Sequence, residues 1–168
     1  MKPVAGSRYT TRLATPTDSI FLREMVSEAA KPISRDVPTR DALLADPRVA
    51  LFVDGWGRVG DHGVVAECDF EPVGAAWFRI FDEGDAEGGF VGGQTPELLI
   101  ALVPEHRGKG VGELLMTALI AKARDEKMAS VGLNVPRANL PAASLFRRLG
   151  FNTMREADGV LTMQLPLT

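Results

Sequence analysis

The sequence places a glycine-rich, positively charged turn between a buried strand and a helix. Residues 97–103 read ELLIALV, a nearly continuous apolar run that is typical of a strand covered on both faces. The run stops at Pro104, and the turn RGKGVG follows at residues 107–112. From Val111 onward the apolar side chains recur with a helical period, which predicts an amphipathic helix. We therefore expect a strand–turn–helix unit within a domain of the α/β class.

This turn is suited to bind an anion such as a phosphate or a pyrophosphate. A helix leaves about four N–H groups at its start without partners inside the helix, and it carries the positive end of its dipole there. Gly108, Gly110 and Gly112 let an anion reach the main chain, because no Cβ stands in the way. Arg107 and Lys109 add positive charge. In the alternative interpretation, the glycines only begin a surface helix.

Two common phosphate-binding motifs do not fit the turn. The dinucleotide motif G-x-G-x-x-G fails because the sixth position counted from Gly108 is Glu113. The nucleoside-triphosphate motif G-x-x-x-x-G-K-[ST] does not occur in the sequence. The pattern that does fit is R-x-x-G-x-G, which runs from Arg107 to Gly112.

The turn and a second segment together resemble the GNAT superfamily of N-acetyltransferases. In that family [QR]-x-x-G-x-[GA] follows the fourth strand and binds the pyrophosphate of acetyl-coenzyme A (acetyl-CoA). The segment NLPAASLFRRLGF, residues 139–151, is similar to the family pattern N-x-x-A-x-x-x-Y-x-x-x-G-F, with Ala142, Gly150 and Phe151 in place. The resemblance covers most of the chain, from Arg8 to the final strand.

The resemblance implies an α/β fold with a mixed sheet of about seven strands, helices on both faces, and fourth and fifth strands that splay apart. It implies that acetyl-CoA is the acetyl donor, that its pantetheine arm faces backbone groups near Leu102 and Val103, and that no metal takes part. The positions expected to bind the coenzyme are Ala101, Leu102, Val103, Arg107, Gly108, Lys109, Gly110, Val111, Gly112, Asn139 and Phe146.

The resemblance also implies that an amine attacks the acetyl carbonyl directly, while a backbone N–H stabilises the negative charge that develops on the oxygen. An amine with a pKa of about 10 is neutral in only about one molecule in a thousand at pH 7, so a base must take its proton, directly or through water. Glu97, at the start of the fourth strand, is the best-placed carboxylate. The alternative interpretation of Glu97 is a solvated glutamate at the end of a strand.

One position departs from the family pattern. The family often has a tyrosine that protonates the leaving thiolate, whereas this chain has Phe146, which has no proton to donate. A coenzyme thiol with a pKa of roughly 8.5, by analogy with cysteine, is a tolerable leaving group without such help. The sequence therefore predicts an enzyme that acetylates a primary amine. The alternative is a non-catalytic acyl-CoA-binding module with a sensor or regulatory role.

Hydrophobic periodicity and capping residues predict the remaining elements. In chain order they are a strand at 9–13, a helix from Pro16 to about Ala30, a second helical region from Pro47 through Trp56, an antiparallel hairpin at 63–81, a long acidic and glycine-rich loop at 82–96, a strand at 129–135, a helix that starts at Asn139 and is capped by Gly150, and two closing strands at 151–154 and 160–165.

Length and composition restrict the classes of function. At 168 residues, the chain is expected to form a single domain over residues 1–168. A formal net charge of −3 disfavours a nucleic-acid partner, and no apolar run approaches the roughly 18 residues that a membrane span requires. His62 and His106 lack metal-ligand spacing and are expected to be solvated loop residues. We expect a cytoplasmic protein with a small-molecule or peptide amine as acceptor, and a homodimer is compatible with the sequence.

Overall fold

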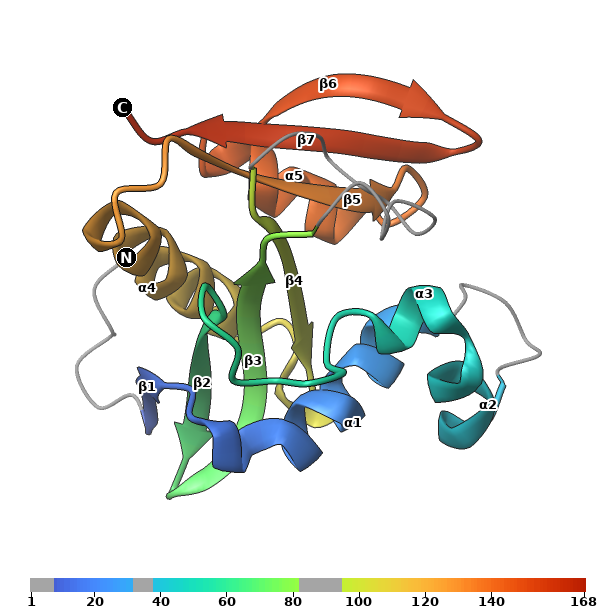
Figure 1. The fold of residues 1–168 in the computed structure, drawn as a ribbon, viewed down its shortest axis with the longest axis vertical. Coiled ribbons are helices and arrows are strands. Elements are labelled where there is room, and N and C mark those ends of the chain that lie inside the picture. Colours follow the sequence, from blue (N-terminus) through green and yellow to red (C-terminus); the bar gives the residue numbers. More distant parts are fainter. Residues whose placement is uncertain (1–7, 32–37, 82–94) are drawn as a thin grey trace.

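The computed structural model describes residues 8–31, 38–81 and 95–168, which fold around one mixed sheet (Figure 1). The strands are β1 (Tyr9–Leu13), β2 (His62–Cys68), β3 (Glu71–Arg79), β4 (Glu97–Leu102), β5 (Ser130–Pro136), β6 (Asn152–Ala157) and β7 (Val160–Pro166). The α-helices are α1 (Ser19–Ala30), α2 (Arg40–Ala45), α3 (Pro47–Ala50), α4 (Val111–Asp125) and α5 (Leu140–Arg148). Short 3-10 turns at Pro16–Asp18 and Pro104–His106 precede α1 and the glycine-rich turn.

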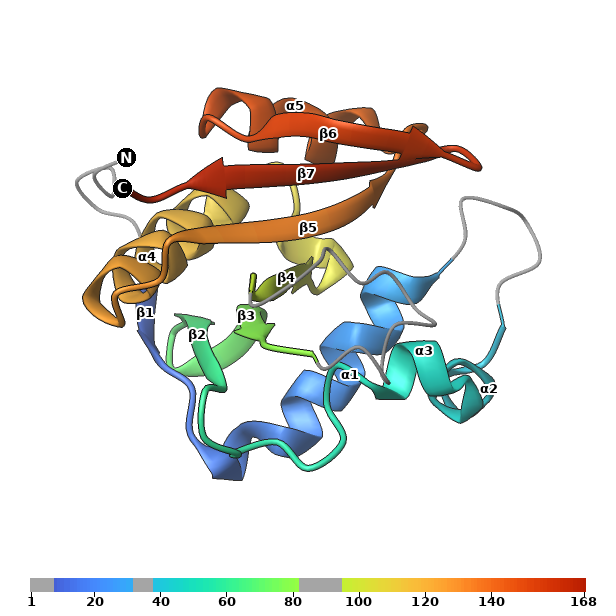
Figure 2. The same cartoon turned by 45° about the horizontal axis from the view of Figure 1, so that its top comes forward.

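The sheet contains seven strands in the order β1-β2-β3-β4-β5-β7-β6. Only the β4–β5 pair is parallel among these described strands. Helix α1 packs on β3 and β4 on one face of the sheet and α4 packs across β1–β4 on the opposite face, while α5 packs beside β5 (Figure 2). The predicted mixed α/β sheet with helices on both faces is therefore confirmed. None of the helices in the described part of the chain is long and apolar enough to cross a membrane.

Strands β4 and β5 meet at one rung and then diverge, as predicted. Within the described residues, their register consists of Glu97 opposite Gly132, where the Gly132 N–H donates to Pro96 O at 2.9 Å. Beyond this rung the two strands run in clearly different directions (Figure 1). We call the diverging part the splay. Past this rung, the N–H and C=O groups of β4 that point toward β5 therefore face the space between the two strands and have no rung with β5 in the described register.

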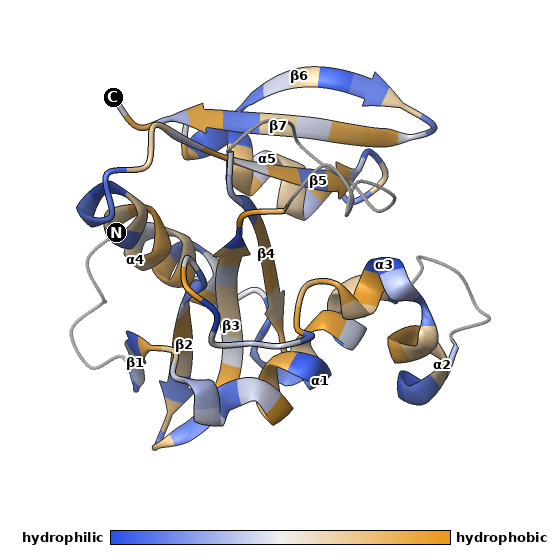
Figure 3. Ribbon diagram, in the orientation of Figure 1, coloured by the Kyte–Doolittle hydropathy of each residue, from blue (hydrophilic) through white to orange (hydrophobic). Residues whose placement is uncertain are grey.

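The side chains of β4 alternate between two hydrophobic clusters. Leu98, Ile100 and Leu102 pack with α4 and α5, whereas Leu99, Ala101 and Val103 pack with α1. Figure 3 shows the hydrophobic colouring along β4 that this double burial requires. The continuous apolar run of the sequence is explained, because both faces of the strand are covered.

The helical region predicted from Pro47 through Trp56 is shorter than expected. Helix α3 ends at Ala50, and residues 51–57 form successive turns. Gly55 and Gly57 have φ angles of +66° and +108°, which a right-handed helix cannot contain. The i, i+3, i+4 spacing of the apolar residues is compatible with successive turns as well as with a helix, so it could not distinguish the two.

Helix α2 was not predicted, although its cap is an ordinary one. The Thr39 hydroxyl accepts from the Ala42 N–H at 3.2 Å. Only one of the six helix residues, Leu43, is buried, so the apolar periodicity is too weak to reveal the helix. Of the loop predicted at 82–96, residues 82–94 lie outside the described residues.

A buried ion pair joins β3 to the segment that follows α3. The Arg79 side chain is 0% exposed and that of Asp61 is 2% exposed. Arg79 donates from Nε to Asp61 Oδ1 at 2.9 Å, from Nη2 to Asp61 Oδ2 at 3.1 Å, and from Nη1 to Leu51 O at 2.9 Å. Asp61 also accepts from the N–H groups of Gly57 and Arg58, each at 3.0 Å. This pair fixes the turns of residues 51–61 against the sheet.

A second carboxylate, Asp18, ties the start of α1 to β1. It accepts two hydrogen bonds from the Arg12 guanidinium, at 2.8 and 2.9 Å, and one from the Thr15 N–H at 2.8 Å. The hydrogen bonds from Arg12 hold the pKa of Asp18 below its ordinary value, although burial acts in the opposite direction. The folded protein therefore favours the ionised form of Asp18.

We expect Asp18→Asn to lower the free energy of unfolding more at pH 7 than at pH 3. Because the folded pKa is lowered, the stabilisation is fully present above the unfolded pKa of about 3.9 and is lost as pH falls through the folded value. Urea unfolding of both proteins at the two pH values measures the difference. An equal loss at both would mean that the charge of Asp18 contributes nothing.

Candidate functional site

The glycine-rich turn leaves its main chain open at the start of α4. Gly108 and Gly110 have φ angles of +73° and +82°, the left-handed region that favours glycine. A Cβ built on Gly108 would meet no atom within 4 Å, so a ligand can approach the main chain there. The Leu114 N–H donates to Gly110 O at 3.2 Å, and the N–H groups ahead of it are those that a helix N-terminus offers to an anion. The turn therefore fits a phosphate group.

The two cations of the turn are placed differently. Lys109 is exposed and forms no ion pair with any described residue. Arg107 turns back toward the end of β4, where its Nη2 lies 3.3 Å from Leu102 O and 3.4 Å from Glu28 Oε2 on α1. Its side chain remains 54% exposed. Lys109 could contact a phosphate at the turn as it stands, whereas Arg107 could do so only after its side chain rotates away from Glu28.

Backbone groups of β4 face the splay at alternate residues. The Val103 N–H donates to Val73 O of β3 at 2.9 Å, which directs the main chain of Val103 away from β5. Main-chain groups alternate in an antiparallel pair, so those of Ala101 also face β3, while those of Ile100 and Leu102 face the splay. Of the two residues near which the backbone role was expected, Leu102 turns its main-chain groups toward the splay and Val103 does not, and the role itself stays a prediction. Ile100 shares this orientation and was not predicted.

Glu97 lies at the rung where the splay begins. It is only 3% exposed, opposite Arg79 on β3 and Gly132 on β5. Directly opposite residues of an antiparallel pair share a face, so the side chain of Glu97 lies on the same side of the sheet as Arg79 and α1. The interpretation of Glu97 as a solvated strand end is wrong, because the residue is buried.

The predicted residues of the second motif lie on α5 and in the core. Asn139 caps the helix by accepting from the Ala142 N–H at 3.4 Å. Phe146 is 3% exposed, and its ring centroid lies 5.8 Å from that of Phe151. A Cβ at Gly112 would make ordinary van der Waals contact with Leu145 of α5, at 3.4 Å from its Cδ2. The described contacts of Asn139 and Phe146 are thus structural, and contact with the coenzyme stays a prediction.

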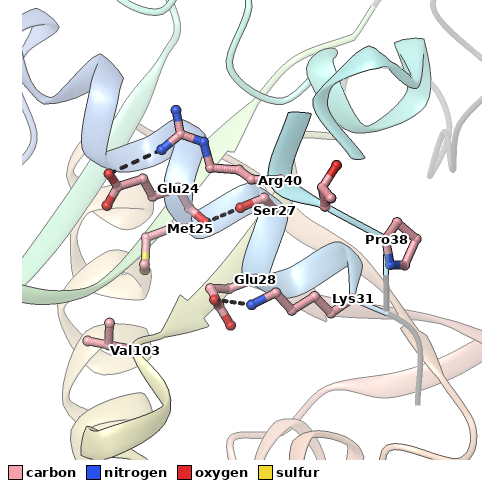
Figure 4. A pocket seen from close by; sticks show the side chains of 9 residues that line it. Glu24, Met25, Ser27, Glu28, Lys31, Pro38, Arg40 and Val103 are labelled. Atoms are coloured by element: carbon pink, nitrogen blue, oxygen red, sulfur yellow. Dashed lines mark hydrogen bonds and ion pairs between the residues drawn. The ribbon is translucent and has the colours of Figure 1, made fainter. Parts of the chain in front are cut away.

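A cavity of about 420 Å³ opens beside the end of β4, between α1 and the start of α2 (Figure 4). We call it the α1–α2 cavity. Two carboxylates and two cations line it, and Arg40 lies 3.5 Å from Glu24. Val103 adds an apolar side chain from the strand end. The lining residues are Glu24, Met25, Ser27, Glu28, Lys31, Pro38, Thr39, Arg40 and Val103.

Both histidines have partners and are not solvated loop residues, so that prediction was wrong. His106 Nδ1 lies 2.8 Å from the Tyr9 hydroxyl, and the two rings meet edge to face. His62 lies 3.6 Å from a carboxylate oxygen of Glu126 and packs near Phe78. No group of three or more His, Cys, Asp or Glu within the described ranges could hold a metal ion.

Sequence reasoning did not predict the α1–α2 cavity or the residues that line it. Glu28 contacts Arg107 across 79 positions of sequence, and no local pattern marks such a pair. The orientation of Ile100 could have been found by counting two residues back along the strand from Leu102, because alternate residues turn their main-chain groups the same way. The carboxylates of α1 read as ordinary surface residues, since charged side chains on a helix usually are.

Comparisons with known proteins point to one family. The model of the Acetyltransferase (GNAT) family matches residues 25–151, a span that includes β4, the glycine-rich turn and α5. Streptothricin acetyltransferase from Streptomyces lavendulae is 26% identical over 194 aligned positions, which cover 99% of this chain and 99% of that protein. Mycothiol acetyltransferase from Arthrobacter sp. (strain FB24) is 40% identical over 60 residues, which make up 36% of this chain and 18% of that protein.

A solved structure shares the fold. It is yncA from Salmonella typhimurium, which was solved with its cofactor acetyl-CoA. It superposes with a TM-score of 0.68 at 23% identity and covers 96% of this chain and 95% of that one. The overall fold of this chain is thus shared by a protein that was solved with acetyl-CoA.

Proposed function

The chain belongs to the acetyltransferase (GNAT) family and is an N-acetyltransferase, and on that premise we propose that it moves the acetyl group of acetyl-CoA to a primary amine by direct transfer. The observation that carries the proposal is the open main chain at Gly108, beside the exposed Lys109 and after a strand that splays from its neighbour. A pyrophosphate needs such a site, since its charge is met by backbone N–H groups and cations.

The acceptor reaches the thioester from the α1 side of the sheet in this proposal. Acetyl-CoA supplies the acetyl group as a thioester, with coenzyme A as the leaving thiolate. The N–H of Ile100 or Leu102 faces the splay and can stabilise the negative charge that develops on the acetyl oxygen. As the C–N bond forms and the C–S bond breaks, the nitrogen loses a proton to Glu97, directly or through water.

Burial suits Glu97 to this role. A carboxylate that is 3% exposed is shielded from bulk solvent and keeps a fixed position at the rung between β4 and β5. Such a group can accept a proton from a nitrogen held in the splay without first shedding a full hydration shell. Phe146 offers no proton, so the thiolate leaves unprotonated and takes its proton from solvent.

A screen of amines tests the proposed reaction. Purified protein is mixed with acetyl-CoA and one acceptor at a time, among them alkylamines, diamines, amino acids, aminoglycosides and peptides with free N-termini, and release of the free thiol is followed. Turnover that depends on the amine supports the proposal. Thiol release at the same rate with every acceptor and with none would be hydrolysis, and would contradict transfer to nitrogen.

Gly110→Val is expected to weaken binding of coenzyme A by about tenfold or more, because it places a branched side chain where the anion would approach and strains a residue at φ +82°. Calorimetric titration measures the dissociation constant. Gly159→Val is the matched control, because Gly159 has φ +76°, open space at its Cβ and a place in the β6–β7 turn. Equal affinities of the two variants would remove the turn from the coenzyme site.

A further inference from the structure

Glu28 lies between the α1–α2 cavity and the glycine-rich turn. It is on the last turn of α1, and its side chain is 17% exposed. Its Oε1 accepts from Lys31 Nζ, while Oε2 lies 3.4 Å from Arg107 Nη2. One carboxylate therefore serves two cations. Lys31 lines the cavity (Figure 4), and Arg107 belongs to the glycine-rich turn.

The two contacts of Arg107 are of the kind that a phosphate displaces. Both are long, at 3.3 and 3.4 Å, and the guanidinium is more than half exposed. An exposed ion pair of this sort contributes little to stability, whereas a guanidinium meets a phosphate with two parallel hydrogen bonds. A pyrophosphate at the turn would thus draw Arg107 away from Glu28 and would leave Oε2 without that cation.

We propose that Glu28 couples the two substrates: coenzyme binding releases its Oε2 from Arg107, and this oxygen then binds an ammonium group of the acceptor in the α1–α2 cavity. This inference rests on the proposed function. Binding free energies are linked reciprocally, so the acceptor and the coenzyme each increase the affinity for the other through this carboxylate.

The proposal restricts the class of acceptor. The nitrogen that attacks the acetyl group must be neutral, so an ammonium held by Glu28 is a second charged group of the same molecule. The acceptor is therefore a small molecule with at least two amino groups, one to be acetylated and one to be recognised. Met25 and Val103 supply apolar contact for the methylene chain between them.

Titration with coenzyme A, in the absence of any acceptor, tests the first half of the proposal. Glu28→Gln keeps the shape of the side chain but removes the charge that competes for Arg107. We expect it to bind coenzyme A about two- to fivefold more tightly than the wild type, the range that an exposed ion pair allows. Glu24→Gln is the matched control, because Glu24 lines the same cavity but contacts Arg40. Equal affinities of the two variants would overturn the coupling.

A pair of acceptors tests the second half. For 1,4-diaminobutane and butylamine, the ratio of kcat/KM values measures recognition of the second ammonium. We expect the wild type to prefer the diamine. In Glu28→Gln the ratio of diamine to butylamine kcat/KM should fall about tenfold, because a hydrogen bond to a charged group is lost. An unchanged ratio in Glu28→Gln would overturn the assignment of Glu28 while leaving the acetyltransferase proposal intact.

Failure of the proposed function would look different. A wild-type protein that binds coenzyme A but acetylates neither these two amines nor any other acceptor would contradict transfer to an amine. In the Glu28 test, by contrast, the wild type is active, and the outcome depends only on how Glu28→Gln differs from the wild type and from Glu24→Gln.

Discussion

Asp61→Ala is expected to lower the free energy of unfolding by about 3 to 5 kcal/mol, the range for removing one partner of a buried ion pair. The cost arises because Arg79 is 0% exposed and would remain charged without its carboxylate. The N–H groups of Gly57 and Arg58 would lose their acceptor at the same time. Urea unfolding followed by circular dichroism gives the free energy.

A surface pair provides the control for this prediction. Arg137 and Glu156 approach to 3.0 Å, but their side chains are 73% and 44% exposed. Glu156→Ala should therefore leave the free energy of unfolding almost unchanged, because solvent screens such a pair. A similar small effect of Asp61→Ala would mean that water enters and solvates Arg79, and that the ion pair does not hold the 51–61 segment in place.

Glu97→Gln is expected to lower kcat by about 100-fold near neutral pH, since proton transfer by a positioned base typically contributes this much or more. The amide has the same shape but cannot take the proton of the attacking nitrogen. The deficit should shrink as pH rises toward the acceptor pKa of about 10, where the amine is increasingly neutral by itself. Initial rates over this pH range measure both effects.

Coenzyme affinity separates catalysis from misfolding in this test. Glu97 lies at the first rung of β4, and the glycine-rich turn follows the other end of the strand, so the dissociation constant of coenzyme A should not change. Wild-type rates at every pH would return Glu97 to a purely structural role. A rate that falls equally at all pH values would likewise speak against proton transfer.

The strand–turn–helix unit could be predicted because its information is local. The apolar run of β4, the glycines and the cations stand next to one another in the sequence, and the positive φ angles of Gly108 and Gly110 are what only glycine adopts readily. The hairpin of β2 and β3 was equally readable, since alternation and a short turn define it. The resemblance to the family was likewise local, since it rested on the turn at 107–112 and on the segment at 139–151.

The residues around the site could not be predicted from the sequence, because their contacts join positions that are far apart in the chain. Asp61 meets Arg79 and Glu28 meets Arg107 only after the sheet has formed, and neither pair has a spacing that identifies it. The burial of Glu97 depends in the same way on the β3 and β5 strands beside it. Charged residues are usually exposed to solvent, so residue type alone predicts that Asp61, Arg79 and Glu97 lie on the surface.

The single rung between β4 and β5 also affects how the protein unfolds locally. A continuous ladder transmits cooperativity from strand to strand, whereas here the β1–β4 and β5–β7–β6 ladders meet at Glu97 and Gly132. Backbone hydrogen bonds thus couple the two ladders only weakly, and most of their coupling falls to the hydrophobic cluster that β2–β4, α4, β5 and β7 share. The Gly132 amide, which donates to Pro96, sits at the boundary of the two units, and its exchange with solvent reports the separation of one from the other.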